Sequence, residues 1–485
     1  MGGSRAGSVL VAFAAAALCV VEVQPAAMAV GSKPAVHTGR AVPSGGTATP
    51  GDELWLKRFN DPANGDDASH AVAVSPDGSS VFVTGSGSGP TSTDYFTVAY
   101  DASTGARRWV KRYNGAGNDV DFANGLGVSP DGSKVFVTGA SPGSTTNYDY
   151  ATVAYAASTG ATLWVNRYNG PGNDDDEAGA LGLSPNGSTV FVTGSSAGSG
   201  TDHDYATVAY RASTGTQRWV KRYNGPGNGF DVAHAVGSSP DGSTMFVTGS
   251  SDDSNGISDY ATVAYRASTG AKLWVRRYNG PQNDVDSASA LSVTPDGSTL
   301  FVTGWSYGST DSDYATLAYT ASTGAKLWVR RYNGPGDFFD FVRAIGVSPD
   351  GFTVFVTGWS YTSQTNSDYA TIAYDVSTGT KLWLRRYNAP GGAEDAPNAL
   401  GLSPDGSEVF LTGSSWGGSN YDFATVAMSA STGTNLWVKR YNGPGNGFES
   451  GEALGVAPDG SAVYVTGESY GSSSYDYATV AYSVT

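Results

Sequence analysis

Acidic residues recur at one position of a repeating pattern, and a ring of such carboxylates can bind a hard cation such as calcium. The residues at this position are Asp67, Asp121, Asp176, Asp231, Asp286, Asp340, Asp395 and Glu449. Further aspartates close in sequence make Asp121, Asp176 and Asp286 the candidate calcium ligands, although none of these segments has the spacing of an EF-hand loop. The alternative interpretation is that each carboxylate accepts backbone N–H bonds and joins one repeat to the next.

A second acidic position is followed 18 residues later by an arginine. The pairs are Asp94/Arg112, Asp149/Arg167, Asp204/Arg222, Asp259/Arg277, Asp313/Arg331, Asp368/Arg386 and Asp422/Arg440. The last aspartate of the series, Asp476, would find its partner in Arg58, near the other end of the chain. We expect these residues to form ion pairs between neighbouring strands and to set the strand register.

One polar position differs from repeat to repeat. It lies three residues after the first acidic position, and its residues are His70, Asn124, Gly179, His234, Ser289, Arg343, Asn398 and Glu452. A mixed polar set suits a ligand site and is not required for packing between repeats. The candidate ligand-binding residues at the mouth of a central channel are therefore His70, Asn124, His234, Arg343, Asn398 and Glu452. The alternative is that these side chains are solvated channel lining.

Aromatic residues gather in the second half of the chain, in the polar loops predicted between the second and third strands of the last four repeats. They are Trp305, Tyr307, Trp359, Tyr361, Trp416, Tyr421, Tyr470 and Tyr475, whereas the corresponding loops of the first half carry almost none beyond Tyr148. A one-sided arc of rings on a Gly/Ser-rich face can stack on sugar rings or grip a peptide. The alternative is that these rings pack over neighbouring repeats.

The element that must position all these residues is a unit of 54 or 55 residues, marked by Trp55, Trp109, Trp164, Trp219, Trp274, Trp328, Trp383 and Trp437. In the unit 286–334, four short strands are predicted at 288–293, 299–303, 313–319 and 327–332, with Pro-Asp-Gly and Ser-Thr-Gly turns. Eight such units predict an all-β fold, an eight-bladed β-propeller of four-stranded antiparallel blades.

Closure of the ring follows from where the units begin and end. The pattern starts with a lone fourth strand at 54–59 and stops at a third strand at 476–482, so the N-terminal strand is expected to complete the last blade. Such a closure leaves few free strand edges. The alternatives are an open array and a seven-bladed ring with one odd unit.

The repeat carries a family resemblance. The runs DYATVAY (149–155), LWVKRYNGPGN (436–446) and GVSPDGS (127–133) resemble the bacterial secreted β-propeller-repeat family, and AYDASTG (99–105) followed by Trp109 is similar to the repeat of quinoprotein (PQQ) propellers. The resemblance covers 51–485 and implies a propeller. It also implies a PQQ-dependent dehydrogenase as one hypothesis, but that family usually carries adjacent cysteines beside the cofactor. The only cysteine here is Cys19, so we predict no PQQ and leave calcium as the candidate ion.

Composition and the N-terminal sequence predict where the protein is located. A net charge of −16 argues against nucleic-acid binding. Residues 1–29 have the features of a secretory signal peptide, with Ala27-Met28-Ala29 as an A-x-A site and cleavage after Ala29. Residues 30–50 are predicted to be a flexible leader and 51–485 a single propeller domain. No second apolar run reaches the length of a membrane span, so we expect a secreted, extracellular protein. We also expect it to be a monomer.

These observations favour a non-catalytic propeller that binds carbohydrate, peptide or protein through the face carrying the loops between second and third strands. One alternative is a structural or surface-associated scaffold without a small-molecule site. The other is a PQQ- or metal-dependent enzyme. Scattered histidines supply no nucleophile–base set, so catalysis is the less favoured hypothesis.

Overall fold

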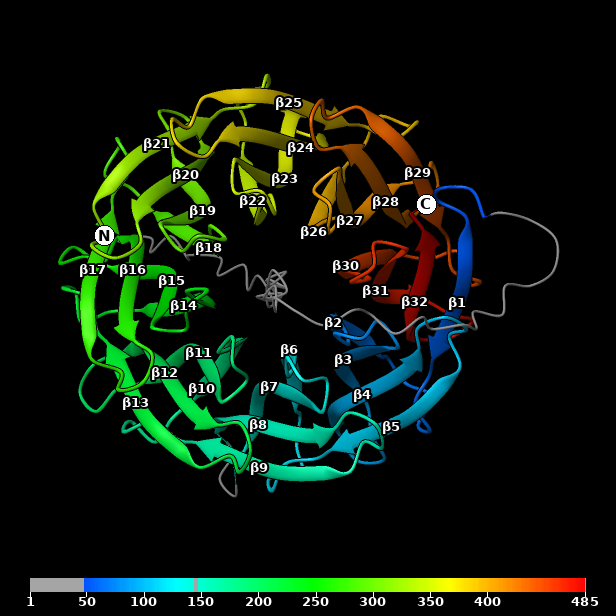
Figure 1. Ribbon diagram of the computed structural model, residues 1–485, viewed down its shortest axis with the longest axis horizontal. Helices are drawn as coiled ribbons and strands as arrows, with labels where there is room; N and C mark the ends of the chain where they lie inside the picture. Colours follow the sequence, from blue (N-terminus) through cyan, green and yellow to red (C-terminus); the bar gives the residue numbers. More distant parts are fainter. Residues whose placement is uncertain (1–47, 144–146, 485) are drawn as a thin grey trace, which may run out of the picture.

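The computed structural model describes residues 48–143 and 147–484, which form 32 β-strands in eight four-stranded sheets. The sheets are arranged as blades around a common axis (Figure 1). This confirms the all-β, eight-bladed propeller of four-stranded antiparallel blades. In these described ranges there is no helix whose length and hydropathy would let it cross a membrane. The predicted signal peptide and most of the predicted leader lie outside the described residues.

Each blade has the same strand order from the axis outward, and blades 1–8 are numbered here by their inner strands. The inner strands are β2 (Ala68–Val74), β6 (Phe122–Val128), β10 (Asp176–Leu183), β14 (Asp231–Ser238), β18 (Asp286–Val293), β22 (Asp340–Val347), β26 (Asp395–Leu402) and β30 (Glu449–Val456). The second strands are β3 (Ser80–Ser88), β7 (Lys134–Pro142), β11 (Thr189–Ala197), β15 (Thr244–Asp252), β19 (Thr299–Tyr307), β23 (Thr353–Ser363), β27 (Glu408–Trp416) and β31 (Ala462–Tyr470).

The two remaining strands complete each blade on its outer side. The third strands are β4 (Thr93–Asp101), β8 (Tyr148–Ala156), β12 (His203–Arg211), β16 (Ser258–Arg266), β20 (Ser312–Thr320), β24 (Asn366–Asp375), β28 (Tyr421–Ser429) and β32 (Tyr475–Ser483). The outer strands are β5 (Arg107–Tyr113), β9 (Thr162–Tyr168), β13 (Gln217–Tyr223), β17 (Lys272–Tyr278), β21 (Lys326–Tyr332), β25 (Lys381–Tyr387), β29 (Asn435–Tyr441) and β1 (Glu53–Phe59).

The second strand is longer than the sequence pattern predicted. In blade 5 it was expected to end at residue 303, but β19 continues to Tyr307, which pairs with Ser312 of β20. Trp305 and Tyr307 were therefore wrongly placed in a loop. The reason is that aromatic residues suit a pleated, half-buried surface, so the strand ends only at Gly308.

Two turns that recur in the repeat need glycine. In blade 5, Gly297 of the Pro-Asp-Gly turn has φ +72° and Gly324 of the Ser-Thr-Gly turn has φ +66°, and side chains other than glycine seldom adopt this region. A Cβ at Gly324 would also lie 2.7 Å from the Trp274 ring of blade 4. The Ser-Thr-Gly turn is thus both a bend in one blade and a docking surface for the blade before it.

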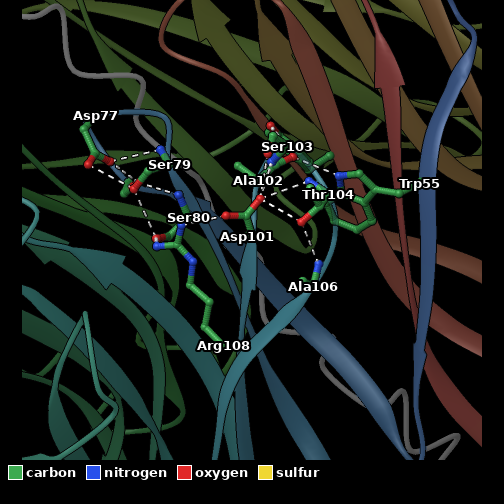
Figure 2. Close-up of polar contacts among 12 residues, drawn as sticks. Trp55, Asp77, Ser79, Ser80, Asp101, Ala102, Ser103, Thr104, Ala106 and Arg108 are labelled. Atoms are coloured by element: carbon green, nitrogen blue, oxygen red, sulfur yellow. Dashed lines mark hydrogen bonds and ion pairs between the residues drawn. The ribbon is translucent and has the colours of Figure 1, made fainter. Parts of the chain in front are cut away.

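The repeated tryptophan joins neighbouring blades through this turn. In the first contact of the series, Trp55 Nε1–H donates to the carbonyl oxygen of Ala102 at 2.8 Å. Figure 2 shows this bond beside the turn of blade 1, where Asp101 accepts hydrogen bonds from Ser103, Thr104 and Arg108. Equivalent indole-to-carbonyl bonds are made by Trp109, Trp164, Trp219, Trp274, Trp328 and Trp383. These tryptophans therefore pack blade against blade.

The core lies between the blades. The described residues contain eight buried hydrophobic clusters, and each combines residues of two adjacent blades. The cluster between blades 4 and 5, for example, contains Phe246, Tyr260 and Trp274 from one blade and Leu300 and Tyr319 from the other. Each blade is therefore stabilised by its two neighbours, as in other repeat architectures.

Ring closure takes the predicted form. β1 pairs antiparallel with β32 from Glu53/Tyr482 to Phe59/Tyr477, and Arg58 forms an ion pair with Asp476 at 2.7 Å. In Figure 1, β1 lies at the outer edge of the last blade, beside β32. The open array and the seven-bladed ring are thereby excluded.

Candidate functional site

The predicted Asp–Arg pairs form in all eight blades, and seven of them measure 2.7–3.0 Å; Arg112 and Asp94 are also in contact. They are not simple exposed pairs. In blade 5, Arg331 also bonds to the Oγ and carbonyl oxygen of Ser306 and donates to the Tyr278 hydroxyl of blade 4 at 3.3 Å. The arginine therefore ties three strands of one blade to the blade before it.

The other acidic position is fully buried in every blade. In blade 4 the Oδ2 atom of Asp231 accepts the backbone N–H of Gly225 at 2.7 Å, and the same bond forms at Asp67, Asp121, Asp176, Asp286, Asp340 and Asp395. Among residues 48–143 and 147–484, no group of three or more His, Cys, Asp or Glu side chains could hold a metal ion. These aspartates thus accept backbone N–H bonds from the segment that joins one blade to the next. The calcium site at Asp121, Asp176 and Asp286 stays a prediction.

Blade 1 departs from this arrangement. In the other blades a serine of the second strand lies beside both the buried acid and the arginine, and in blade 1 this position is Gly87. The backbone N–H that bonds to Asp67 belongs to Asp61, which is itself acidic. Burial raises the pKa of Asp67 to about 8, and the nearby Asp61 carboxyl adds to the rise. Asp67 is therefore an acid that the folded chain prefers to keep protonated near neutral pH.

Replacing Asp67 with Asn should remove a pH dependence of folding. Because the folded-state pKa of Asp67 is raised, its contribution to stability is complete below the unfolded pKa near 4 and is lost as pH rises through about 8. The free energy of unfolding of the wild type should fall by roughly 4 kcal/mol more than that of Asp67→Asn between pH 5 and pH 9. Urea unfolding at several pH values checks this, and a difference that does not change with pH would contradict it.

The varied polar position lies on the inner strands, as predicted. Its side chains are all half-buried, and the residues on either side of them in the strand are mostly buried. Asn124 donates to the Ala178 carbonyl oxygen of the next inner strand at 2.9 Å, and Asn398 donates to Gly451 O at 3.1 Å. Burial lowers the pKa of His70 and His234 to about 4, so both are neutral at pH 7. Asn124 and Asn398 therefore form hydrogen bonds between neighbouring blades.

Arg343 and Glu452 are the charged members of this position. The guanidinium of Arg343 lies 4.5 Å from the ring centre of Trp359, and its Nε–H has no hydrogen-bond partner among the described residues. Burial raises the pKa of Glu452, and the Arg343 charge works against that rise. Asn398 lies between their blades and is 3.4 Å from Glu452 Oε1. The structure thus brings together Arg343, Asn398 and Glu452 from blades 6–8.

The predicted aromatic arc divides into contacting groups. Phe341 packs between Trp305 at 5.6 Å and Trp359 at 5.4 Å, measured between ring centres. Tyr470 and Tyr475 are 5.2 Å apart in blade 8. The eight predicted arc residues are all half-buried. The rings therefore pack on one another and still keep part of their surface exposed.

A carboxylate within the arc is Glu394, at the end of the loop that leads into blade 7. The hydroxyl of Tyr421 donates to its Oε2 atom at 2.9 Å, and that of Tyr361 to its Oε1 atom at 3.4 Å. Trp416 lies against Tyr421 with ring centres 5.2 Å apart. Phe448, which directly precedes the inner strand of blade 8, has its ring centre 5.4 Å from that of Tyr421. This group joins blades 6, 7 and 8.

Sequence reasoning missed Glu394, Phe339, Phe341 and Phe448. For Phe339, Glu394 and Phe448 a signal was present, because the residue just before the buried acid varies from repeat to repeat. The residues at this position are Asp66, Val120, Asp175, Phe230, Val285, Phe339, Glu394 and Phe448. The side chains of this face are rings, a carboxylate and a guanidinium, which suit recognition of a ligand by stacking and charge.

Comparisons with known proteins agree with this architecture. The family model described as outer membrane protein assembly factor BamB matches residues 96–385, more than half of the chain. No curated protein matches the chain.

Solved structures share the fold at low sequence identity. The structure of Chaetomium thermophilum Sqt1 bound to the N-terminus of the ribosomal protein L10 is 12% identical, with a TM-score of 0.60 over 89% of this chain and 100% of that chain. The quinohemoprotein alcohol dehydrogenase from Comamonas testosteroni is also 12% identical, with a TM-score of 0.53 over 89% of this chain and 76% of that chain. Together with the closed ring of repeats, the family match shows that this chain belongs to the outer membrane protein assembly factor BamB family of PQQ-like propellers.

Proposed function

We propose that this propeller is an extracytoplasmic, non-catalytic binding module that holds a segment of a partner protein on the face where the second and third strands of blades 5–8 are connected. The observation that carries the proposal is the one-sided distribution of half-exposed rings. The two positions occupied by Trp305 and Tyr307 in blade 5 hold only Ser, Ala, Pro and Asp in blades 1–4. Packing between blades is the same in all eight, so it does not require this asymmetry.

The kind of ligand follows from the shape and partners of the rings. They extend over four blades and alternate with Glu394 and Arg343, which suits an extended chain with several side chains better than one small molecule. The family name describes an assembly factor, and Sqt1, which has the same fold, is bound to an N-terminal protein segment. Both support a peptide or protein partner.

The test is a double variant, Trp359→Ala with Trp416→Ala, assayed for saturable binding of a displayed library of random linear peptides. We expect binding to fall at least about 10-fold, because clustered aromatic anchors carry most of the energy of such contacts. The melting temperature should change little, since both rings are only half-buried. The matched control is Leu327→Ala with Leu382→Ala, two outer-strand side chains that are 50% and 53% exposed.

Other outcomes would favour the other hypotheses. Ring-dependent binding of soluble oligosaccharides, with no peptide bound, would replace the protein segment with a carbohydrate. A large loss of stability with no ligand of either kind would favour the scaffold. A rise in melting temperature on adding PQQ would support the quinoprotein enzyme, because a ligand that binds only the folded state stabilises it.

A further inference from the structure

We propose that the partner segment presents a lysine or arginine side chain to the site formed by Glu394, Tyr361, Tyr421, Trp416 and Phe448, called here the Glu394 cage. This inference rests on the proposed function and names the chemistry of the partner. Three observations carry it: the state of the carboxylate, the rings around it, and the charge of the surrounding face.

The carboxylate of Glu394 is held in place without being neutralised. Both of its oxygens accept hydrogen bonds from tyrosine hydroxyls, Tyr421 at 2.9 Å and Tyr361 at 3.4 Å. Burial and then the bond to Glu394 raise the pKa of Tyr421 to about 12, so this donor keeps its proton at neutral pH. Neutral donors orient a carboxylate but leave its negative charge.

No basic side chain of the described ranges offsets that charge. Each aspartate of the Asp–Arg series forms an ion pair with its own arginine, but no ion pair involves Glu394 in residues 48–143 and 147–484. A half-buried carboxylate that is already positioned and still charged is complementary to a cation from outside the chain.

The rings around Glu394 are of the kind that bind cations. The ring centre of Tyr421 lies 5.2 Å from that of Trp416 and 5.4 Å from that of Phe448, and Phe448 is 39% exposed. A lysine or arginine gains from a place over an aromatic face, and a neighbouring carboxylate adds to the attraction. Within the described part of the chain, cation–ring contacts form only at Trp274, Trp328 and Trp359. No cation of the described ranges lies over a ring of the Glu394 cage.

The same arc already binds one guanidinium. Arg343 lies over Trp359 at 4.5 Å, and Phe341 links Trp359 to Trp305. This contact shows, within the molecule, that a ring of the arc is placed to take an arginine. That arginine comes from the inner strand of blade 6, and no arginine within 48–143 and 147–484 lies over a ring of the cage in blade 7.

Further carboxyl groups lie close together in blade 8 and at its boundary with blade 1. Burial raises the pKa of Glu468 to about 7, and the nearby carboxylates of Glu452 and Asp66 contribute to the rise. Crowded carboxylates of this kind are relieved by a cation. A basic segment running across blades 7 and 8 would therefore meet the cage in blade 7 and further carboxyl groups in blade 8.

The experiment compares peptide selection and binding in Glu394→Gln, Trp416→Ala and a matched control, Asp175→Asn. Asp175 also directly precedes the buried acid of its blade, but Ala197 stands where blade 7 has Trp416. Asp175→Asn removes the same charge and keeps an acceptor for the Tyr148 N–H, which lies 3.0 Å from Asp175 Oδ1. The peptides are those selected on the wild type from the random library, with binding measured by fluorescence anisotropy near 0.15 M salt.

We expect the selected peptides to be enriched in Lys or Arg. Their affinity should fall at least about 10-fold in both Glu394→Gln and Trp416→Ala and by less than about two-fold in Asp175→Asn. Replacing the basic residues of a selected peptide with Gln should weaken wild-type binding as much as Glu394→Gln does, and should have no further effect in that variant.

The failures are distinguishable. Neutral or acidic peptides whose binding requires Trp416 but does not change in Glu394→Gln would contradict the proposal of a basic partner. The proposed function would still hold. Equal losses in Glu394→Gln and Asp175→Asn would show general attraction to an acidic protein and also overturn the cage. Absence of any ring-dependent peptide binding would overturn the proposed function itself.

Discussion

A chain that starts at residue 61 is expected not to form a stable closed monomer. It lacks β1, which pairs with β32 along its whole length and brings Trp55 and Phe59 into the cluster shared with blade 1. Removing one large buried aromatic side chain costs about 3–5 kcal/mol, and the deletion removes two together with a strand of backbone hydrogen bonds. The loss should exceed about 5 kcal/mol, comparable with the whole stability of many domains.

The deletion also exposes an edge. β32 would present unpaired N–H and C=O groups, and free strand edges promote association with other chains. Size-exclusion chromatography and urea unfolding should therefore show aggregates or an uncooperative transition. A chain starting at residue 48, which keeps β1, is the control and should unfold cooperatively. A synthetic peptide of residues 48–62, added in excess, should partly restore the shortened chain.

Cooperative unfolding of the shortened chain at unchanged urea concentration would contradict this expectation. It would mean that seven blades and an incomplete eighth are sufficient. The closure by β1 would then be a cap on a ring that is stable without it.

Two tryptophans of blades 4 and 5 are expected to respond very differently to replacement by alanine. Trp274 is 7% exposed; it donates to Ala321 O at 3.0 Å and lies between Phe246 and Tyr319. Trp274→Ala should lower the free energy of unfolding by about 4 kcal/mol, because it opens a cavity between blades and leaves a carbonyl without its donor.

Trp305→Ala is the matched comparison, because Trp305 is half-buried and belongs to the arc. Its replacement should cost roughly 1 kcal/mol, as expected for a side chain that keeps contact with solvent. Urea unfolding of both variants, with Trp274→Phe as a third, measures the difference. Equal losses would place Trp305 in the structural core and remove it from the proposed binding face.

The repeated positions could be predicted well from the sequence. The spacing of the tryptophans, the two glycine turns and the Asp–Arg series all led to the observed blade, because every blade meets the same packing problem. The register of the ion pairs followed from strand alternation and a hairpin turn. What the pattern did not reveal was their environment, since the Ser306 and Tyr278 contacts of Arg331 come from another strand and another blade.

The candidate site could be predicted only in part. The arc residues were identified by comparing blades, but Trp305 and Tyr307 were assigned to a loop and Glu394 was overlooked. The acidic position looked as suited to calcium as to backbone bonding. Only the packed structure showed that aspartates at this position, such as Asp121 and Asp231, accept a backbone N–H of the loop that leads into their blade.

The sequence by itself determined the architecture of this protein: eight four-stranded blades, closed by the first strand of the chain. That was possible because each unit contacts only its neighbours, so one solution is repeated around the ring. Tertiary structure alone decided which side chains meet on the face that carries the aromatic arc. Glu394 meets Tyr361, 33 residues before it in one blade, and Tyr421, 27 residues after it in another. Such contacts depend on how adjacent blades are set against each other, which no period in the sequence encodes.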